Sequence, residues 1–450
     1  MVRVGSKVSL AGSRAVRGAR WTTGSPMPRE SLLYVAPVIP RETGNGLAMR
    51  AASLLEALAR RFDIHLFVAP VAGESEPPDD VLVGRTVRIG KLDLAANLDP
   101  LFRLIARIPD PAARARAELA YPKPYASRFC GIDAGRFLED WSRMSPPAAV
   151  HLTRLYLAPL AEPFLLRKGP DRPYCVLDLD DDEVRSHKRL AQLHNAAGDR
   201  RAATVADAEA VKYRALAEYY FPLFDRVIVC SDTDAARLKA SFPQARFSVV
   251  PNSYRSPSRL VRHGSEGGPL RLLFVGNLGY LPNVDAVLFL CREILPALRR
   301  LTDRDIRIDV AGAGAVTALR SLIPDRGVTF HGGVDDLAPL YAAADAAVVP
   351  LRAGGGTRIK LLEAFAHGLP AVATRLGSEG IDAVDGTHVL LADDAEGFAR
   401  ACLSVKENPD LAAALAGRAA ALLLARYSPA QVDAGITQAY SAFAPGRGGE

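Results

Sequence analysis

The chain has 450 residues, of which 49% are hydrophobic and 24% are charged, and this balance excludes a disordered or fibrous protein. The formal net charge is +6, but residues 1–30 alone contribute +5, since they hold six basic residues and one acidic residue. Because the excess lies in one short segment, it does not support a nucleic-acid partner, and we predict none.

Residues 1–30 are rich in Arg, Gly and Ser and lack an apolar run, so we expect a disordered basic arm and no secretory signal. No run of 18 uninterrupted apolar residues occurs in the chain, so no transmembrane helix is expected. The five cysteines are far apart and lack metal-ligand spacing, which predicts reduced thiols. These features favour a cytoplasmic protein.

The first half alternates short Val-, Ile- and Leu-rich runs with longer helical patterns, which is typical of βαβ units around a parallel sheet. A helix is predicted over residues 44–61, and one or two long helices are predicted between residues 182 and 221. The predicted strands are residues 32–36, 64–68, 149–152, 174–177, 227–229 and 247–250. We assign residues 31–252 to a Rossmann-like N-terminal domain.

Residues 253–269 combine Ser, Pro, Gly and charge without periodicity, and they predict an interdomain linker. A second alternating series follows, with a helix predicted over residues 283–300. Its predicted strands are residues 270–275, 306–311, 328–330, 346–349, 371–374 and 389–391. We assign residues 270–442 to a second Rossmann-like domain and residues 443–450 to a flexible tail. The predicted fold class is therefore α/β, with two doubly wound domains.

Three predicted strands of the second domain end in glycine-rich segments, at residues 276–279, 312–314 and 353–357. Ligands bind at the carboxyl ends of strands in open parallel sheets, and glycine lets the backbone approach a phosphate closely. The first two segments fit a tight strand-to-helix turn equally well, because neither carries the full dinucleotide fingerprint.

The third segment precedes a predicted helix over residues 358–367, with Arg358 and Lys360 in its first turn. Cations there oppose the helix dipole unless an anion binds between them, which predicts a phosphate or diphosphate site. Glu363 lies about one turn further along and is expected to accept hydrogen bonds from ribose hydroxyls. The alternative for Glu363 is an ion pair with Lys360.

Several motifs, in order over about 150 residues, resemble the nucleotide-sugar domain of GT-B glycosyltransferases of the group 1 or family 4 type. They are FVGN at 274–277, PNVDA at 282–286, VTFHG at 328–332, VVP at 348–350, KLLEAFA at 360–366 and GLP at 368–370. The first half resembles the acceptor domain more loosely, through VVPN at 249–252. The resemblance implies the GT-B fold, with two Rossmann-like domains facing a cleft.

The resemblance also implies a retaining, metal-independent transfer of a sugar from a UDP-sugar or GDP-sugar. Of the family's Glu-x7-Glu motif only the second member, Glu363, is present, and the first maps onto Gly355. The family's phosphate-binding cations map onto Asn277 and Pro282, so both are missing. A subgroup with Gly-Gly-x-Arg-x-Lys, to which exopolysaccharide sugar transferases belong, shares these substitutions. We infer that Arg358 and Lys360 replace the lost cations and stabilise the departing diphosphate.

By the same resemblance, the donor contacts fall on three loops. We expect the diphosphate at Gly276 and Asn277 and the base at His331, although a structural histidine fits equally well. The sugar pocket is expected to be lined by Gly354, Gly355, Gly356 and Thr357.

The N-terminal domain is expected to bind the acceptor, which the resemblance implies to be a glycan or a polyprenyl-linked glycan. The candidate residues are Gly44, Asn45, Gly46, His151, Arg154 and Asp180. Arg154 could pair with an acceptor phosphate or bridge to the acidic run 178–183. The Asp-x-Asp sequence at 178–180 also permits a metal-binding GT-A reading, which would leave residues 353–363 unexplained.

A basic cluster between residues 103 and 128 alternates with apolar residues. It could be an interfacial helix at the inner face of the cytoplasmic membrane, or a solvated helix face and loop. Two functional alternatives to transfer also remain. The chain could be a GT-B sugar-nucleotide epimerase, or a non-catalytic sugar-nucleotide-binding protein, the latter suggested by Gly355.

Overall fold

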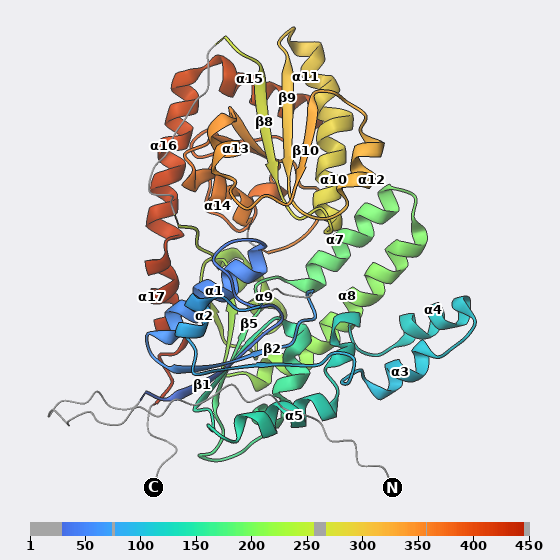
Figure 1. Ribbon diagram of the computed structural model, residues 1–450, viewed down its shortest axis with the longest axis vertical. Helices are drawn as coiled ribbons and strands as arrows, with labels where there is room; N and C mark the ends of the chain where they lie inside the picture. Colours follow the sequence, from blue (N-terminus) through green and yellow to red (C-terminus); the bar gives the residue numbers. More distant parts are fainter. Residues whose placement is uncertain (1–28, 74–76, 256–266, 357, 445–450) are drawn as a thin grey trace, which may run out of the picture.

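The computed structural model describes residues 29–73, 77–255, 267–356 and 358–444. These residues form two α/β domains, one above the other along the long axis of the molecule (Figure 1). Almost all of the predicted basic arm, most of the predicted linker, most of the predicted tail and Thr357 lie outside the described residues.

The N-terminal domain is built on a parallel sheet with the strand order β3-β2-β1-β4-β5-β6-β7. Its strands are β1 Ser31–Ala36, β2 Asp63–Val68, β3 Arg88–Lys91, β4 Ala149–Thr153, β5 Tyr174–Asp178, β6 Arg226–Val229 and β7 Phe247–Val249. Its α-helices are α1 Gly46–Ala59, α2 Asp80–Gly84, α3 Pro100–Ala106, α4 Pro111–Ala120, α5 Ile132–Ser142, α6 Glu162–Leu165, α7 Glu183–Ala196, α8 Arg200–Tyr220 and α9 Asp232–Ser241. Short 3-10 helices are η1 Tyr125–Phe129, η2 Leu155–Ala161 and η3 Phe221–Leu223.

The C-terminal domain has a parallel sheet with the order β10-β9-β8-β11-β12-β13. Its strands are β8 Leu270–Val275, β9 Ile306–Ala311, β10 Val328–Gly332, β11 Ala346–Val349, β12 Ala371–Ala373 and β13 Leu390–Leu391. Its helices are α10 Leu281–Phe289, the π segment η4 Leu290–Ile294, α11 Leu295–Leu301, α12 Val316–Leu322, α13 Ala338–Ala343, α14 Ile359–Ala366, the 3-10 helix η5 Leu376–Ser378, α15 Ala395–Glu407 and α16 Pro409–Arg426.

All twelve predicted strands are confirmed, because the central strands of both sheets are covered on both faces and so read as continuous apolar runs. Strand β3 was not predicted. It lies at the edge of the sheet, carries Arg88 and Lys91, and none of its four residues is fully buried. Short polar edge strands lack the apolar signal.

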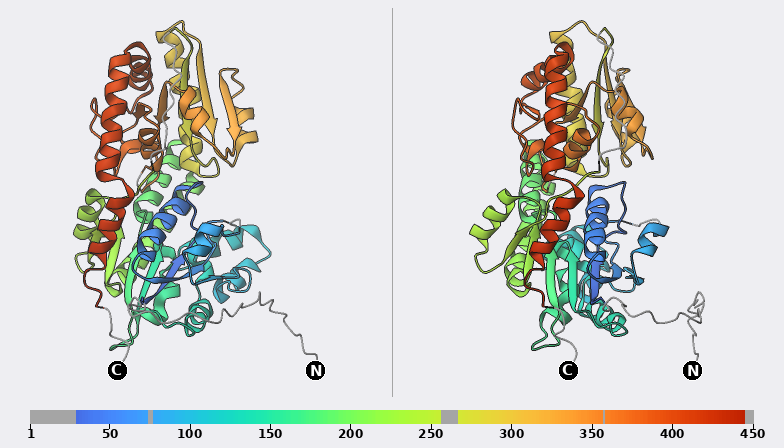
Figure 2. Two further views of the ribbon diagram at one scale, coloured as in Figure 1. Left: turned by 60° about the vertical axis from the view of Figure 1, so that its left-hand side comes forward. Right: turned by 90° about the vertical axis from the view of Figure 1, so that its left-hand side faces the viewer.

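The last helix, α17 Pro429–Ala439, packs against α1 and β7 of the N-terminal domain. Its residues Val432, Ile436 and Ala439 belong to the core around β1 and β2. Figure 2 shows α16 and α17, in red, running along both domains. The predicted C-terminal domain therefore extends too far, since we had assigned it residues up to 442.

The stretch Pro409–Ala439 is the one part of the described chain that is long and apolar enough to cross a membrane. This differs from our expectation, which rested on uninterrupted apolar runs. Within the fold, α16 packs on α14 and α15, and α17 packs on α1. The buried apolar side chains of both helices, among them Leu415, Leu423 and Ile436, thus pack inside the two domains, whereas Leu424 is 64% exposed.

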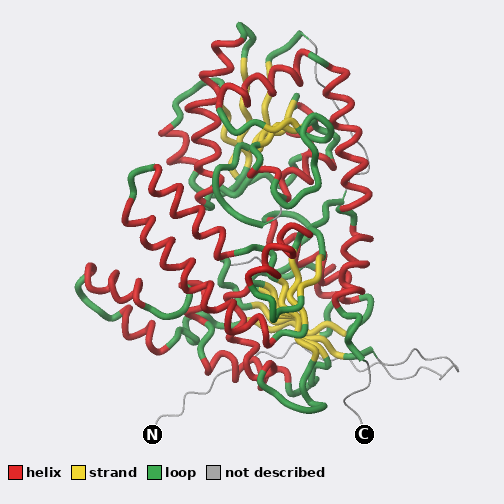
Figure 3. Tube along the Cα trace, turned by 180° about the vertical axis from the view of Figure 1, so that it is seen from behind, coloured by secondary structure: helices red, strands yellow, loops and turns green. Residues whose placement is uncertain are grey.

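Helices α3 and α4 project from the side of the N-terminal domain (Figure 3). Of the basic cluster predicted there, Lys123 pairs with Asp99 at 2.8 Å and Arg128 stacks on the Tyr125 ring. Leu101 and Leu104 are 48% and 62% exposed. A contact with a membrane surface at this helix pair stays a prediction.

In each sheet the strand order reverses between two neighbouring strands, β1 and β4 in one domain and β8 and β11 in the other. In open α/β sheets such a switch point, at the carboxyl ends of the strands, is where ligands bind. The segments after β8 and β11 are the first and third glycine-rich segments. The fold therefore brings these two segments together at one switch point.

Candidate functional site

The first two glycine-rich segments pack directly on each other. Leu278 pairs with Gly314 as an isolated bridge, and the Leu278 amide donates to the Ala313 carbonyl at 2.7 Å. A β-carbon at Gly312 would lie 1.9 Å from the Gly276 carbonyl oxygen, and Gly312 also has φ +147°. These glycines are required by close backbone packing, which is the tight-turn alternative.

Lys360, in the first turn of α14, reaches across to the first glycine-rich segment. A β-carbon added at Gly276 would lie 2.9 Å from both Cε and Nζ of Lys360. The half-buried ammonium lies 5.9 Å from the centroid of the Phe274 ring. It forms no hydrogen bond or ion pair with another residue in the described part of the chain. A cation thus lies where the loops after β8 and β11 meet.

Burial, together with the nearby charge of Arg358, lowers the pKa of Lys360 to about 8, although Glu363 opposes the shift. A buried ammonium without an anionic partner costs free energy, because it has lost hydration without gaining an ion pair. An anion bound beside Nζ would restore that interaction. The electrostatics therefore indicate an anion site at Gly276 and Lys360.

We had expected Arg358 to lie beside Lys360 with its guanidinium free for an anion, but the structure shows a different arrangement. Its buried guanidinium donates to the carbonyls of Leu376 at 3.0 Å, Gly355 at 2.7 Å and Gly354 at 3.2 Å. The side chain thus holds the glycine-rich loop in place. Three of its five N–H donors are thus taken by backbone carbonyls, and the contact between Arg358 and the diphosphate stays a prediction.

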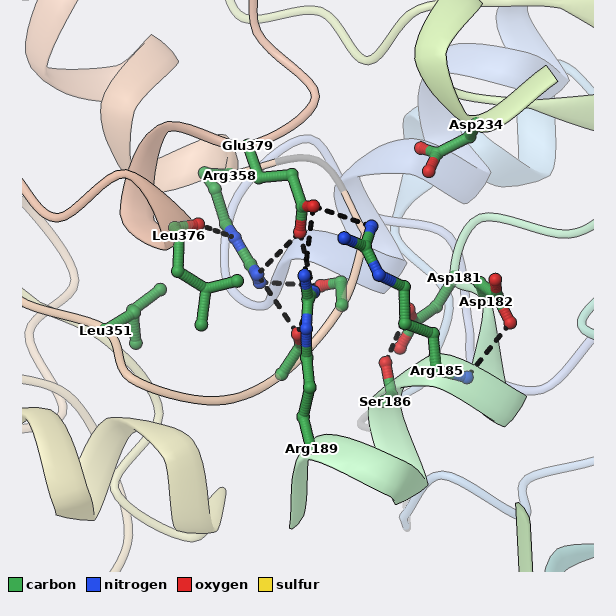
Figure 4. Close-up of polar contacts among 12 residues, drawn as sticks. Asp181, Asp182, Arg185, Ser186, Arg189, Asp234, Leu351, Arg358, Leu376 and Glu379 are labelled. Atoms are coloured by element: carbon green, nitrogen blue, oxygen red, sulfur yellow. Dashed lines mark hydrogen bonds and ion pairs between the residues drawn. The ribbon is translucent and has the colours of Figure 1, made fainter. Parts of the chain in front are cut away.

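Glu379 collects three arginines at the boundary between the domains (Figure 4). Arg185 and Arg189 of α7 approach it at 2.6 Å each, and Arg358 lies 3.9 Å away. Burial opposes ionisation of Glu379, but the hydrogen bonds and charge of the arginines outweigh it and lower its pKa. Arg189 also donates to the Gly354 carbonyl at 2.9 Å. Helix α7 of the N-terminal domain therefore binds both the loop 353–356 and Glu379 of the C-terminal domain.

Glu363 is held by tyrosines rather than by Lys360. The Tyr254 hydroxyl donates to Glu363 Oε1 at 2.9 Å, and Tyr341 lies beside the same carboxylate. Burial raises the pKa of Glu363, although both hydroxyls counteract the shift. The alternative of an ion pair between Glu363 and Lys360 is not what the structure shows. The carboxylate keeps acceptor positions for further hydroxyl groups.

Gly355 and Gly356 face the N-terminal domain. A β-carbon at Gly355 would lie 2.0 Å from Ser186 Oγ and 2.1 Å from Asp181 Oδ1, and one at Gly356 would lie 3.2 Å from the Asp180 carbonyl oxygen. Gly354 has φ +100°. The predicted sugar-pocket loop therefore packs against the segment after β5 and the first turn of α7. Thr357 lies outside the described residues.

The segment Gly44, Asn45 and Gly46, predicted to bind the acceptor, lies against α14 of the C-terminal domain. A β-carbon at Gly46 would come within 2.9 Å of Ile359 Cδ1. Asn45 caps α1, since its side chain accepts a hydrogen bond from the Ala48 amide at 2.9 Å. The turn into the helix and the position at the domain boundary are thus both present.

The acidic run after β5 avoids self-repulsion because its carboxylates have different partners. Asp178 is buried against Arg50, Asp180 pairs with Arg154, and Asp181 accepts from Ser186. Asp182 caps α7 at the Arg185 amide and accepts from Arg237.

No group of three or more metal-ligating side chains that could hold an ion occurs among the described residues. Asp178 and Asp180 are therefore engaged by arginines, as in the bridging alternative for Arg154.

Arg154 and Asp180 both have left-handed backbones, with φ of 77° and 54°. Such strain in non-glycine residues clusters at functional sites. Their ion pair is 2.7 Å long, and Arg154 also lies 3.6 Å from Asp181 and from Glu183. Both oxygens of the buried Glu183 carboxylate lack a hydrogen bond to any described residue. The strained pair lies beside Gly356 at the domain boundary.

The two predicted histidines and Asn277 each have a partner within the chain. His151 is fully buried, its Nδ1 lies 2.9 Å from the Tyr440 hydroxyl, and burial together with Arg50 lowers its pKa to about 3. It therefore cannot contact an acceptor from where it lies. His331 Nε2 lies 2.7 Å from Asp309 Oδ1. Asn277 accepts from the Gly279 amide at 2.8 Å, which stabilises the turn.

Sequence reasoning missed Tyr254, Tyr341, Arg189 and Glu379 as parts of the site, and it noted Asp181 only within the acidic run 178–183. Tyr254 fell in the predicted linker, and Arg189 in a long helix without a distinctive pattern. Their partners are 165 to 190 residues away for Arg189 and 109 residues away for Tyr254, so only the folded chain brings them together.

Residues 269–408 match the family described as Glycosyl transferases group 1. A search among curated sequences finds no match to the chain. Sucrose-phosphate synthase from Thermosynechococcus elongatus is similar in structure, with a TM-score of 0.63 and 16% identity over 92% of this chain and 99% of that chain.

Two further similar structures were solved with ligands. HepE from Anabaena, in complex with UDP and glucose, has a TM-score of 0.57 and 14% identity over 92% of this chain and 100% of that chain. TarM from S. aureus, in complex with fondaparinux, alpha-GlcNAc-glycerol and UDP, has a TM-score of 0.60 and 10% identity over 91% and 99%. Residues 269–408 thus match the model of the group 1 glycosyltransferases, and the chain as a whole has the GT-B fold of these solved structures.

Proposed function

We propose that the protein transfers a sugar from a nucleoside diphosphate sugar to a glycan or polyprenyl-linked glycan in polysaccharide assembly, with retention at the anomeric carbon. The observation that carries the proposal is the Lys360 ammonium at the switch point between β8 and β11, which has no hydrogen bond or ion pair among the described residues. UDP is the first nucleotide to test, since the similar HepE and TarM structures contain it.

In this proposal the diphosphate binds beside Gly276 and Lys360, and the ribose hydroxyls donate to Glu363. Charge accumulates on the diphosphate as the sugar–oxygen bond breaks, so a fixed cation stabilises the transition state more than the ground state. Arg358 keeps loop 353–356 in position through its three carbonyl contacts. The acceptor enters from the same face of the sugar as the departing diphosphate.

Nucleotide release separates transfer from its two alternatives. UDP-, GDP- and ADP-hexoses are incubated with the protein, with and without a glycan acceptor, and both free nucleotide and donor isomers are quantified. Transfer predicts nucleotide release that depends on the acceptor. An isomerised donor without release would indicate the epimerase, and thermal stabilisation without turnover would indicate a binding protein.

Replacement of Glu363 by alanine is expected to weaken UDP binding by about 10-fold or more, because a charged hydrogen-bond acceptor for the ribose is lost. Calorimetry with UDP and with its 2′-deoxy and 3′-deoxy forms checks the reason. The wild type should prefer UDP to at least one deoxy form, whereas the variant should not. Titrations at pH 6.5 keep Lys360 charged, and the exposed Glu407→Ala is the control. Unchanged discrimination in the Glu363 variant would exclude the ribose contact.

Addition of EDTA is expected to leave the transfer rate unchanged. The carboxylates of Asp178 and Asp180 are paired with arginines, which leaves them poorly suited to a divalent cation. The measurement is nucleotide release after dialysis against EDTA, followed by addition of Mg²⁺ or Mn²⁺. Loss of activity that Mn²⁺ restores would favour a metal-dependent enzyme.

A further inference from the structure

Two side chains of the N-terminal domain lie against Gly355, a position of loop 353–356 that has no side chain of its own. Asp181 and Ser186 occupy the volume into which a side chain at position 355 would project, at 2.1 and 2.0 Å from its β-carbon position. Figure 4 shows Ser186 on α7 with Asp181 beside it. The loop carries glycine at this point, and the chemistry that faces it comes from the other domain.

The Asp181 carboxylate is held in a defined orientation. Its Oδ1 accepts from Ser186 Oγ at 2.9 Å, and its Oδ2 lies 3.6 Å from Arg154 Nη1. A carboxylate offers about four acceptor positions, so a single hydrogen bond and a loose ion pair leave capacity for further donors. Its side chain is 14% exposed, which means that the group is desolvated but still reachable.

The surrounding contacts keep this carboxylate against the loop. Arg189, on the same helix as Ser186, donates to the Gly354 carbonyl and pairs with Glu379. Gly356 packs on the Asp180 carbonyl, and Asp180 is fixed by Arg154. Position, orientation and free acceptor capacity therefore coincide at the loop that we propose binds the sugar.

We propose that Asp181 is the positioning residue for the donor sugar, with its carboxylate accepting hydrogen bonds from hydroxyl groups of a sugar held by loop 353–356. This inference rests on the proposed function. It assigns part of the donor pocket to the N-terminal domain, so the pocket is complete only when α7 is clamped to Glu379. Donors with free hydroxyl groups on the side facing Asp181 are preferred over their deoxy forms.

The first test compares Asp181→Asn with the wild type, using the hexose donor that gives the fastest nucleotide release. The kcat/KM for this donor should fall about 10- to 100-fold, since an amide replaces a charged acceptor. Affinity for the free nucleoside diphosphate should stay the same, because it lacks the hexose that Asp181 is proposed to contact. Deoxygenated analogues of the donor sugar should include one that the wild type discriminates against and the variant does not. Asp207→Asn, an exposed carboxylate on α8, is the matched control.

The second test is a double-mutant cycle with Gly355→Ala. The new β-carbon would displace the Asp181 carboxylate, so this variant alone should lower kcat/KM to a similar extent. The combined variant should be no worse than either single variant, because both remove the same interaction. Thermal unfolding of each variant establishes that it folds.

The outcomes distinguish the inference from the function on which it rests. If the wild type neither binds nor turns over any nucleoside diphosphate sugar, the proposed function fails. If the wild type transfers sugar and Asp181→Asn matches it in kcat/KM and in discrimination between sugars, only the role of Asp181 is overturned. Additive losses in the cycle would also overturn it.

Discussion

Replacement of Lys360 by alanine is expected to lower kcat/KM for the donor by about 10²- to 10³-fold. The ammonium is the cation that touches the first glycine-rich segment, and it lies against Gly276 with no described anionic partner. Preorganised charge aimed at a developing anion commonly contributes a factor of this size. Steady-state release of the nucleotide measures the loss, and Lys239→Ala, an exposed lysine on α9, is the control.

The same substitution is expected to stabilise the fold at pH 7. The pKa of Lys360 is lowered from 10.5 to about 8 by burial, so the charged form is less favourable in the folded chain than in the unfolded one. Between these two pH values the unfolded state binds more protons, and the free energy of unfolding of the wild type therefore rises with pH. Alanine removes this dependence. After allowance for partial exposure the gain at pH 7 is about 1 kcal/mol.

Donor binding should depend on pH through the same group. Below pH 8 the free protein carries the charged ammonium, and above it the proton must be taken up when the diphosphate binds. The dissociation constant of the wild type should therefore increase as the pH rises beyond about 8, while that of the alanine variant should stay flat. Equal pH profiles for the two proteins would show that Lys360 does not contact the diphosphate.

Much of the fold was predictable because each β-strand is a local apolar run bounded by turn residues. The strands β8 and β11 were recognised from their own residues, and the position of their glycine-rich ends at one edge of the sheet follows from parallel topology. Lys360 and Glu363 could be selected because Lys360 lies in the first turn after the third segment and Glu363 lies about one turn further along. The residues that Lys360 and Glu363 contact could not be predicted, because they are distant in the sequence.

The remaining parts of the site depend on contacts across the domain boundary. Arg358 and Lys360 look equivalent in the sequence, yet one is turned toward three carbonyls and the other toward Gly276. The Arg358 guanidinium lies 3.9 Å from Glu379, and it shares the Gly354 carbonyl with Arg189 of α7. Neither Glu379 nor α7 is close to residue 358 in the sequence. His151 was misjudged for the opposite reason. It lies within the central strand β4, where Tyr440, the residue that follows α17, covers it, and no local pattern places α17 there.

Replacement of Arg358 by alanine is expected to abolish most activity and also to destabilise the protein. Three backbone carbonyls, on Gly354, Gly355 and Leu376, lose a charged donor, and Glu379 loses one of its three arginines. A loss of about 3 kcal/mol is expected from hydrogen bonds of this kind in a buried setting. The melting temperature should fall by ~6 °C or more. The exposed Arg418→Ala is the control.

The contrast between the two cations is the decisive feature of this prediction. Lys360→Ala should lose turnover and gain stability, because Lys360 has no hydrogen-bond or ion-pair partner among the described residues. Arg358→Ala should lose both turnover and stability, because Arg358 is already bound to three backbone carbonyls. Lysine at position 358 should not restore activity, since an ammonium cannot reproduce the planar donor geometry that spans Leu376, Gly355 and Gly354. Differential scanning calorimetry and nucleotide release on the same preparations separate these roles. A stable, inactive Arg358→Ala protein would instead return Arg358 to the diphosphate.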